Sequence, residues 1–157
     1  INSYLDFPKI IACGGSWMVP GDLISAGEWD KIEQLTREAV QTMLGFELAH
    51  IGVNAENEEE ALKAANRFAF LFGMPAKVGN SSIFAGSALE VMKTPYLGKN
   101  GHIAIRTNYI DRAVNYMESV LGVKFNEESA KRDAKGALKA IYLDEEIGGF
   151  AVHLVQK

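Results

Sequence analysis

The sequence has few of the features that mark secreted, membrane or nucleic-acid-binding proteins. Cys13 is the single cysteine in 157 residues, so no disulfide can form within the chain, and this usage is typical of a reducing cytoplasm. No apolar run reaches the roughly 18 residues of a membrane span, and no secretory signal is evident. Positive charge is not in excess, since the formal net charge is −4. We therefore expect a cytoplasmic protein that binds neither nucleic acid nor membrane.

The length and the composition are ordinary for a globular protein. The hydrophobic fraction is 48% and the charged fraction is 23%. A chain of this length suits one domain, or one domain with an appendage, and can bury a sizeable core. The first residue is Ile1 rather than methionine. We expect from this that the chain is a piece of a longer protein.

Residues 1–45 have a pattern of their own. Phe7–Cys13 is a nearly continuous apolar run, which predicts a short strand buried on both faces. Gly14, Gly15 and Ser16 follow it; such a turn can present backbone N–H groups to a phosphate, although these residues alone favour a plain tight turn. A short helix is predicted for residues 22–26. An amphipathic helix is predicted for residues 28–44, ended by a glycine and carrying the apolar stripe Trp29, Ile32, Leu35, Ala39, Val40 and Met43.

This segment resembles the last βα unit of the KDPG/KHG aldolase barrel (2-keto-3-deoxy-6-phosphogluconate and 4-hydroxy-2-oxoglutarate aldolases). The resemblance is carried by Pro8-Lys-Ile-Ile-Ala-Cys-Gly-Gly-Ser-Trp-Met-Val-Pro20, by Trp29-Asp-Lys-Ile and by Arg37-Glu-Ala-Val40. It implies that Gly15 and Ser16 help to bind a substrate phosphate, and that the parent protein is a lyase. The earlier strands of that barrel, with the Schiff-base lysine and its acidic partner, are absent. The chain as given is therefore not expected to run the aldolase reaction.

From residue 46 onward the sequence is organised as a duplication. His50-Ile-Gly-Val and His102-Ile-Ala-Ile repeat one motif, and each copy is followed by an Asn, an acidic helical run and a Gly. Alternating apolar residues and Gly-containing turn signals predict three short strands after each helix. Residues 128–136, rich in charge, are expected to be a solvated hairpin end. The predicted strands are 46–54, 76–79, 82–85, 88–93, 102–108, 124–127, 137–143 and 149–155, and the predicted helices are 57–72 and 110–121.

The predicted fold class is α+β. Two βαβββ repeats, about 46–94 and 101–157, form a domain over residues 46–157 whose sheets pair into a cupped mixed surface with the helices outside. The fragment 1–45 precedes this domain. We expect that fragment to pack against the repeats or against a second copy of the chain, because one strand and one helix cannot enclose a core.

Alternation along the strands brings four polar residues to matching positions of the two repeats. His50 and His102 occupy the first strands, and His153 and Glu90 occupy the last strands, each with apolar neighbours that turn to the other face. Burying a charged Glu between Leu and Val is costly unless it is paired or metal-bound. Three imidazoles and a carboxylate suit one divalent ion such as Zn²⁺, Ni²⁺, Fe²⁺ or Mn²⁺. A pocket that binds no metal, or that binds an organic ligand through the same residues, is the alternative.

The repeats resemble the vicinal oxygen chelate (VOC) superfamily, which includes glyoxalase I, extradiol dioxygenases and fosfomycin-resistance proteins. The resemblance rests on Leu48-Ala-His-Ile-Gly-Val-Asn54, Ala88-Leu-Glu-Val-Met92, Gly101-His-Ile-Ala-Ile-Arg106 and Ala151-Val-His-Leu-Val155. It implies metal ligation by His50, Glu90, His102 and His153. Glyoxalase I has a Glu at the last position, where it also moves the substrate proton; His153 departs from this, although a His can act as a base. The resemblance implies catalytic roles for His153 and Glu90, and the two-His, one-carboxylate set of a dioxygenase is also available.

Other polar residues carry weaker signals. Arg106 shares its strand face with His102 and is a candidate for binding a substrate carboxylate or phosphate. A purely structural role for Arg106 is an equal alternative. Lys93, Tyr96 and Tyr142 lie near strand ends and are not assigned a role. The phenylalanines at 68, 70 and 72 are interpreted as helix packing.

The sequence therefore favours a metal-binding module that acts as a lyase or isomerase on a small 2-oxo acid or its derivative, in a protein related to an aldolase. The expected partners are a small-molecule substrate and a second copy of the chain, in a homodimer or larger homo-oligomer. The alternative is a module that binds a metabolite, or holds an aldolase oligomer together, without chemistry of its own.

Overall fold

The structure is a computed structural model that describes residues 1–7 and 9–157. The described residues form two compact units, Ile1–Phe46 and Glu47–Lys157. Each unit is described by itself below.

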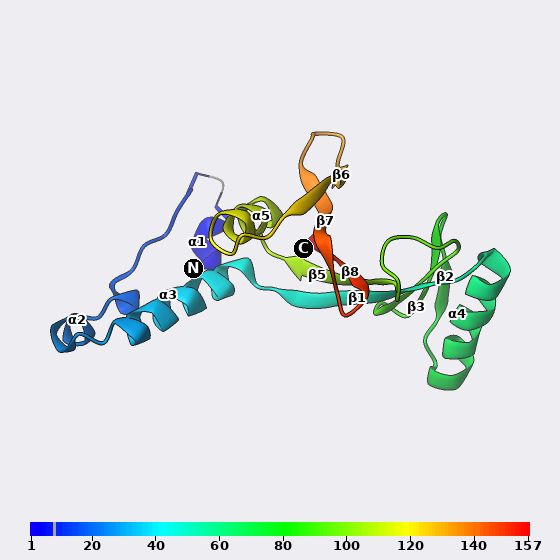
Figure 1. Cartoon of the computed structure of the whole chain (residues 1–157), viewed down its shortest axis with the longest axis horizontal. Helices are drawn as coiled ribbons and strands as arrows, with labels where there is room; N and C mark the ends of the chain where they lie inside the picture. Colours follow the sequence, from blue (N-terminus) through cyan, green and yellow to red (C-terminus); the bar gives the residue numbers. More distant parts are fainter. Residues whose placement is uncertain (8) are drawn as a thin grey trace. The chain divides into compact units, whose positions relative to one another are not determined.

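The first unit is helical where it is regular. α1 (Asn2–Leu5), a 3₁₀ turn η1 (Ser16–Met18), α2 (Gly21–Ala26) and α3 (Trp29–Leu44) follow one another (Figure 1). α2 and α3 end at Gly27 and Gly45, both in the left-handed conformation that glycine adopts without a Cβ penalty. The two predicted helices are thus confirmed to within a residue. α1 was not expected, and its Asn2 side chain donates a hydrogen bond to the carbonyl of Thr42.

The strand predicted for residues 7–13 is wrong for the residues that the structure describes. Phe7 and residues 9–13 have no strand conformation, and Pro8 lies outside the described residues. Ile11 is 85% exposed and Trp29, on the predicted apolar stripe of α3, is 61% exposed. The physical reason is that a strand needs neighbouring strands to pair its backbone, and the described part of this unit offers none.

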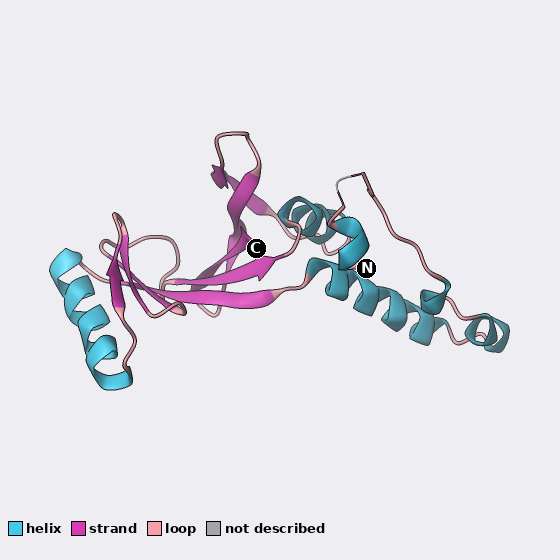
Figure 2. Cartoon of the chain, turned by 180° about the vertical axis from the view of Figure 1, so that it is seen from behind, coloured by secondary structure: helices cyan, strands magenta, loops and turns pink. Residues whose placement is uncertain are grey.

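The second unit is built on one eight-stranded sheet with the order β2-β3-β4-β1-β5-β8-β7-β6. β1 pairs in parallel with β4, β5 pairs in parallel with β8, and the antiparallel β1–β5 pair joins the two halves. The sheet is open and curved, and the β6–β7 hairpin rises away from the plane of β1 (Figures 1 and 2). The strands are β1 (Glu47–Asn54), β2 (Ala76–Val78), β3 (Ser82–Ala85), β4 (Leu89–Met92), β5 (His102–Thr107), β6 (Phe125–Arg132), β7 (Leu138–Ile147) and β8 (Phe150–Gln156).

Two helices complete the βαβββ repeats. α4 (Glu58–Phe72) begins at Asn57, whose side chain accepts a hydrogen bond from the Glu60 N–H. It packs on β2, β3 and β4, where Ala61, Ala65, Ile83 and Val91 form a buried cluster. α5 (Ile110–Ser119) packs on β7 and β8. The predicted fold class and element order are confirmed. The chief difference in extent is β6, which continues to Arg132 through residues expected to be a hairpin end.

Two groups of apolar side chains are exposed. Ile51 and Val53 point away from the cup as expected, but they are 38% and 41% exposed within the structure, because the two helices cover the outer strands rather than β1. Phe70 and Phe72 of α4 were interpreted as packing residues and are 80% and 64% exposed. Two of the three phenylalanines thus remain at the surface of α4.

Among the described residues, the helices are all too short or too polar to span a lipid bilayer.

Candidate metal centre

The sheet register places the four predicted ligands in two adjacent rows across the cup. In one row Glu90, Gly52 and His102 lie side by side on β4, β1 and β5. In the next row His50, Ala104 and His153 lie side by side on β1, β5 and β8. Each row therefore has a small residue between two polar ones. This arrangement leaves space above the middle strands, into which the four longer side chains converge.

The polar atoms of three residues meet at one point. The Glu90 Oε2 atom is 3.0 Å from His50 Nε2 and 3.1 Å from His102 Nε2, and the two nitrogens are 3.2 Å apart. His153 completes a triangle of imidazoles whose ring centroids are 5.2 to 5.5 Å apart. Ligand atoms of the three histidines lie within 4.8 Å of one another, so these residues can form a metal site.

The spacing fits a small divalent ion. Atoms that ligate one ion at about 2.0–2.1 Å lie about 3.0–3.4 Å apart, which is the spacing of the Glu90–His50–His102 triangle. The buried His153 also carries two ring nitrogens with no hydrogen-bond partner among the described residues, and one of them could ligate an ion. Unpaired polar atoms in a buried site are costly unless something binds them. The geometry and the donor set therefore both fit a metal.

The electrostatics hold Glu90 and His153 in the forms that a cation needs. Burial would raise the pKa of Glu90, but hydrogen bonds from His102, His50 and Ser82 outweigh burial and lower that pKa well below its usual range. Burial, with the nearby His102 and His50, lowers the pKa of His153 to about 3. At neutral pH the site thus presents an ionised carboxylate at Glu90 and a neutral imidazole at His153 with one ring nitrogen free to ligate.

Gly52 makes room for His102. A Cβ at this position would overlap the imidazole ring of His102, which lies across β1 at 2% exposure. The ring can therefore reach Glu90 only because its neighbour on β1 is a glycine. The sequence motif His-Ile-small contains this feature, and the structure explains why the third position is small.

Three residues at the site carried no assignment from the sequence. Ser82 donates a hydrogen bond of 2.5 Å to Glu90 Oε1, and Phe84 meets the edge of the His50 ring with centroids 5.5 Å apart. Tyr142 stacks on His153 with centroids 4.5 Å apart and an interplanar angle of 18°. Strand alternation places these side chains on the cup face, but only cross-strand register shows which of them reach the ligands.

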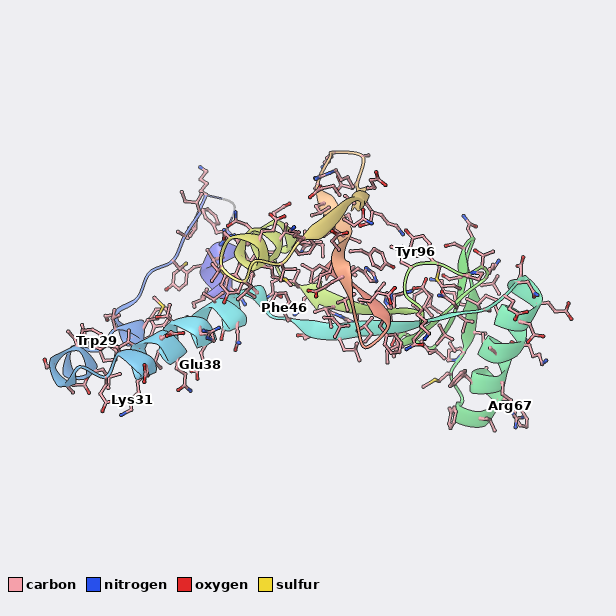
Figure 3. All side chains as sticks on the ribbon, in the orientation of Figure 1. Trp29, Lys31, Glu38, Phe46, Arg67 and Tyr96 are labelled. Atoms are coloured by element: carbon pink, nitrogen blue, oxygen red, sulfur yellow. The ribbon has the colours of Figure 1, made fainter. Side chains whose placement is uncertain are left out.

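The loop between β4 and β5 closes one side of this cluster. Asn54, at the end of β1, exchanges hydrogen bonds with the Tyr96 backbone, and the Tyr96 ring lies 5.9 Å from that of Tyr142. Figure 3 shows Tyr96 in this loop beside the sheet. Burial, with Tyr96 and Glu90 nearby, raises the pKa of Tyr142 above its ordinary value, so its phenol stays protonated at neutral pH.

The stacking of the Tyr142 and His153 rings predicts that Tyr142 positions His153. Among the described residues His153 has no hydrogen-bonding group to orient its ring, so the flat face of Tyr142 takes the place of the usual outer-shell acceptor. We expect Tyr142→Leu to weaken Zn²⁺ affinity about tenfold in a chelator-competition titration, and Tyr142→Phe to bind Zn²⁺ as the wild type does. Equal losses in both variants would show that the hydroxyl, and not the stack, is what matters.

The other predicted site residues lie in two places. Arg106 is on the cup face of β5, four residues beyond His102, and shares a pocket with His50. Gly15 and Ser16 belong to the first unit, where Ser16 begins η1 and the Trp17 ring occupies the place that a Cβ on Gly15 would take. The structure therefore shows no strand-and-phosphate loop among the described residues around them, and their role stays a prediction.

Comparison with curated proteins supports the aldolase resemblance over a short stretch. The chain is 50% identical over 40 residues to a 2-dehydro-3-deoxy-phosphogluconate aldolase of Haemophilus influenzae, and 47% identical over 40 residues to a KHG/KDPG aldolase of Escherichia coli. Each match covers 26% of this chain and 19% of the relative. The chain thus spans about a fifth of the length of the curated relatives that it matches.

Comparison with solved structures supports the fold of the repeats. A hypothetical protein from Bacillus halodurans has a TM-score of 0.50 at 15% identity, covering 71% of this chain and 94% of that one. A Streptomyces coelicolor methylmalonyl-CoA epimerase has a TM-score of 0.50 at 16% identity, covering 70% of this chain and 96% of that one. No family model matches the chain. The expected pairing of an aldolase-like segment with a VOC fold is confirmed.

Proposed function

We propose that Glu47–Lys157 is a metal-dependent lyase or isomerase module for a small 2-oxo acid or its derivative. The observation that carries the proposal is the triangle of Glu90 Oε2, His50 Nε2 and His102 Nε2, with sides of 3.0 to 3.2 Å. His50, Glu90, His102 and His153 would hold one divalent ion, of which Zn²⁺, Ni²⁺, Fe²⁺ and Mn²⁺ are candidates. An ion bound there supplies Lewis acidity toward two adjacent oxygens of a substrate.

The accessible side of the centre is the side of His50 and Glu90. Their side chains are 16% and 15% exposed, whereas His102 is 2% exposed and His153 is 7% exposed. Of the two residues expected to be catalytic, Glu90 is therefore the one that can meet a substrate. We assign proton transfer to Glu90 because of this exposure, and we assign His153 to ligation.

The choice of a 2-oxo acid rests on the aldolase-like segment. The relatives that match this segment are aldolases of 2-oxo-acid substrates by their names, and the link from them to the second unit is one of association. A metal centre of this kind suits two neighbouring oxygens of a substrate. This property and the similarity to the aldolases together make the 2-oxo carboxylate the first substrate class to examine.

Metal content and turnover test the proposal together. The purified chain, loaded in turn with each of the four ions and desalted, is expected to retain one ion per chain by elemental analysis. His50→Ala is expected to retain less than a tenth as much at limiting metal. The loaded chain is then incubated with 4-hydroxy-2-oxoglutarate and with 2-oxoglutarate, and products are followed by NMR. A wild-type chain that retains no transition metal would overturn the metal-dependent function.

A non-catalytic module in a homo-oligomer is the second candidate. The observation that favours it is the uncovered outer face of β1, where Leu48, Ile51 and Val53 are 55%, 38% and 41% exposed. A second copy of the chain would remove these side chains from water. A loaded chain that binds 2-oxo acids and leaves them unchanged in the NMR assay would favour this candidate over the enzyme.

A further inference from the structure

A pocket adjoins the metal centre on its accessible side. It has a volume of about 620 Å³ and lies where β1, β5 and β8 come together. His50 forms part of its wall, and the other polar residues of the wall are Glu47, Ser87, Arg106, Gln156 and Lys157. A ligand in this pocket therefore touches one residue of the metal centre and a group of charged side chains.

The charges in the pocket favour an anion. Lys157 Nζ is 2.8 Å from Glu47 Oε1, and Glu47 also lies opposite Arg106 across the β1–β5 pair, so the wall carries two cationic side chains and one carboxylate side chain. Arg106 donates one hydrogen bond of 3.3 Å, from Nη2 to the Ala49 carbonyl. Its Nε is buried, with no acceptor among the residues that the structure describes. A guanidinium has five N–H donors in a flat fork, so Arg106 has donors left for a carboxylate.

The amide of Gln156 is already occupied. Its oxygen accepts from the Ile110 N–H, and its nitrogen donates to the carbonyls of Asn108 and Lys157. Gln156 thus shapes the wall rather than serving the ligand. Arg106 is the group in the pocket with both charge and unused donors.

The spacing of His50 and Arg106 along the sheet indicates the approximate length of a ligand that reaches both. His50 lies opposite Ala104 on β5, and Arg106 is two residues farther along the same strand and on the same face. Two residues of a strand span about 7 Å. A chain of four to six carbons, at about 1.3 Å of extension per carbon–carbon bond, has a length comparable to this spacing, so a short diacid is the size of ligand to consider.

We propose that this pocket binds the distal carboxylate of a short dicarboxylic 2-oxo acid, with Arg106 as the anchoring residue. The proposal rests on the proposed function, because it takes the two near oxygens of the substrate to lie at the metal centre. It adds the substrate class: a five-carbon 2-oxo diacid is selected over a 2-oxo acid of the same length that ends in a methyl group.

Matched ligands test the subsite. 2-Oxoglutarate and 2-oxopentanoate have five carbons each, and only the first has a distal carboxylate. In titration calorimetry with the Zn²⁺-loaded chain, 2-oxoglutarate is expected to bind about 10- to 100-fold more tightly, as for a hydrogen-bonded pair of charges. Arg106→Gln is expected to reduce this preference below about threefold, with Zn²⁺ content and 2-oxopentanoate affinity unchanged. Arg67→Gln, on α4 (Figure 3), is the control and is expected to keep the full preference.

The outcomes separate this inference from the proposed function. Equal affinity for the two acids in the loaded wild type, or an unchanged preference in Arg106→Gln, would overturn the subsite. Should Arg106→Gln fail to fold, Arg106→Lys is measured instead and is expected to lose at least half of the preference in free energy, because lysine cannot form the fork. A chain that binds no metal would contradict the proposed function but would leave the Arg106 subsite untouched. Succinate titrated into the metal-free chain then tests the subsite, and binding that persists unchanged in the Arg106 variant overturns it.

Discussion

His102→Ala is expected to abolish specific metal binding, with a fall in Zn²⁺ affinity of more than about 100-fold. His102 is the most deeply buried of the four predicted ligands, and its Nε2 lies within 3.2 Å of both Glu90 and His50. The variant leaves the two remaining histidines and Glu90 around a gap at the centre of the sheet. Chelator competition measures the affinity, and Lys77→Ala, an exposed residue on β2, is the control that should bind as the wild type does.

The same variant is expected to destabilise the metal-free protein by about 2–4 kcal/mol. A buried side chain is removed, which leaves a cavity, and the Glu90 carboxylate loses one of its three hydrogen-bond donors. Urea unfolding in the presence of EDTA measures this loss. The wild type is expected to gain stability when Zn²⁺ replaces EDTA, and the variant is expected to gain little. Equal gains in both proteins would show that the ion binds away from His102.

The sequence was a sufficient guide to the repeats because their signals are local. The period of apolar residues, the glycines that end helices and the turn dipeptides lie within a few residues of the elements that they define. Apart from β6 and β7, which extend farther than predicted, these elements were found close to their predicted bounds. The duplicated His-Ile-small motif then pointed to residues that lie close together in the structure, because two equivalent strands in one sheet bring equivalent positions together.

The features that the sequence did not reveal depend on contacts between distant residues. Which residue of one strand faces a ligand on another depends on register, and so Ser82 and Tyr142 had no local signal that set them apart. The uncovered faces of Ile51 and Phe70 have the same origin, because periodicity shows which face is apolar but not whether anything covers it. The absent strand at residues 9–13 is a further case, since an apolar run forms a strand only beside another strand.

Gly52→Ala is expected to weaken Zn²⁺ affinity about 10- to 100-fold through its effect on His102. The added methyl group would overlap the His102 ring, and Gly52 is buried between β4 and β5, so the backbone has little room to yield. The ring must turn away from Glu90 to relieve the overlap. Overpacking of this kind costs about 1–3 kcal/mol of stability in the metal-free protein, which urea unfolding in EDTA measures.

Gly21→Ala provides the matched control, because a Cβ at the start of α2 meets nothing within 4 Å. It is expected to leave both metal affinity and the stability of the second unit unchanged. A Gly52→Ala variant with wild-type affinity would show that the ring does not need the space above β1.

A double variant identifies the route by which Gly52 acts. If the methyl group matters only because it displaces His102, then adding Gly52→Ala to His102→Ala costs no further affinity, since the displaced ring is already gone. If Gly52→Ala distorts β1 itself, it also moves His50 on the same strand, and the two losses add. Zn²⁺ affinity of the four proteins in this cycle separates the two cases. We expect the non-additive result, because the three atoms nearest to the Cβ position at residue 52 all belong to the His102 side chain.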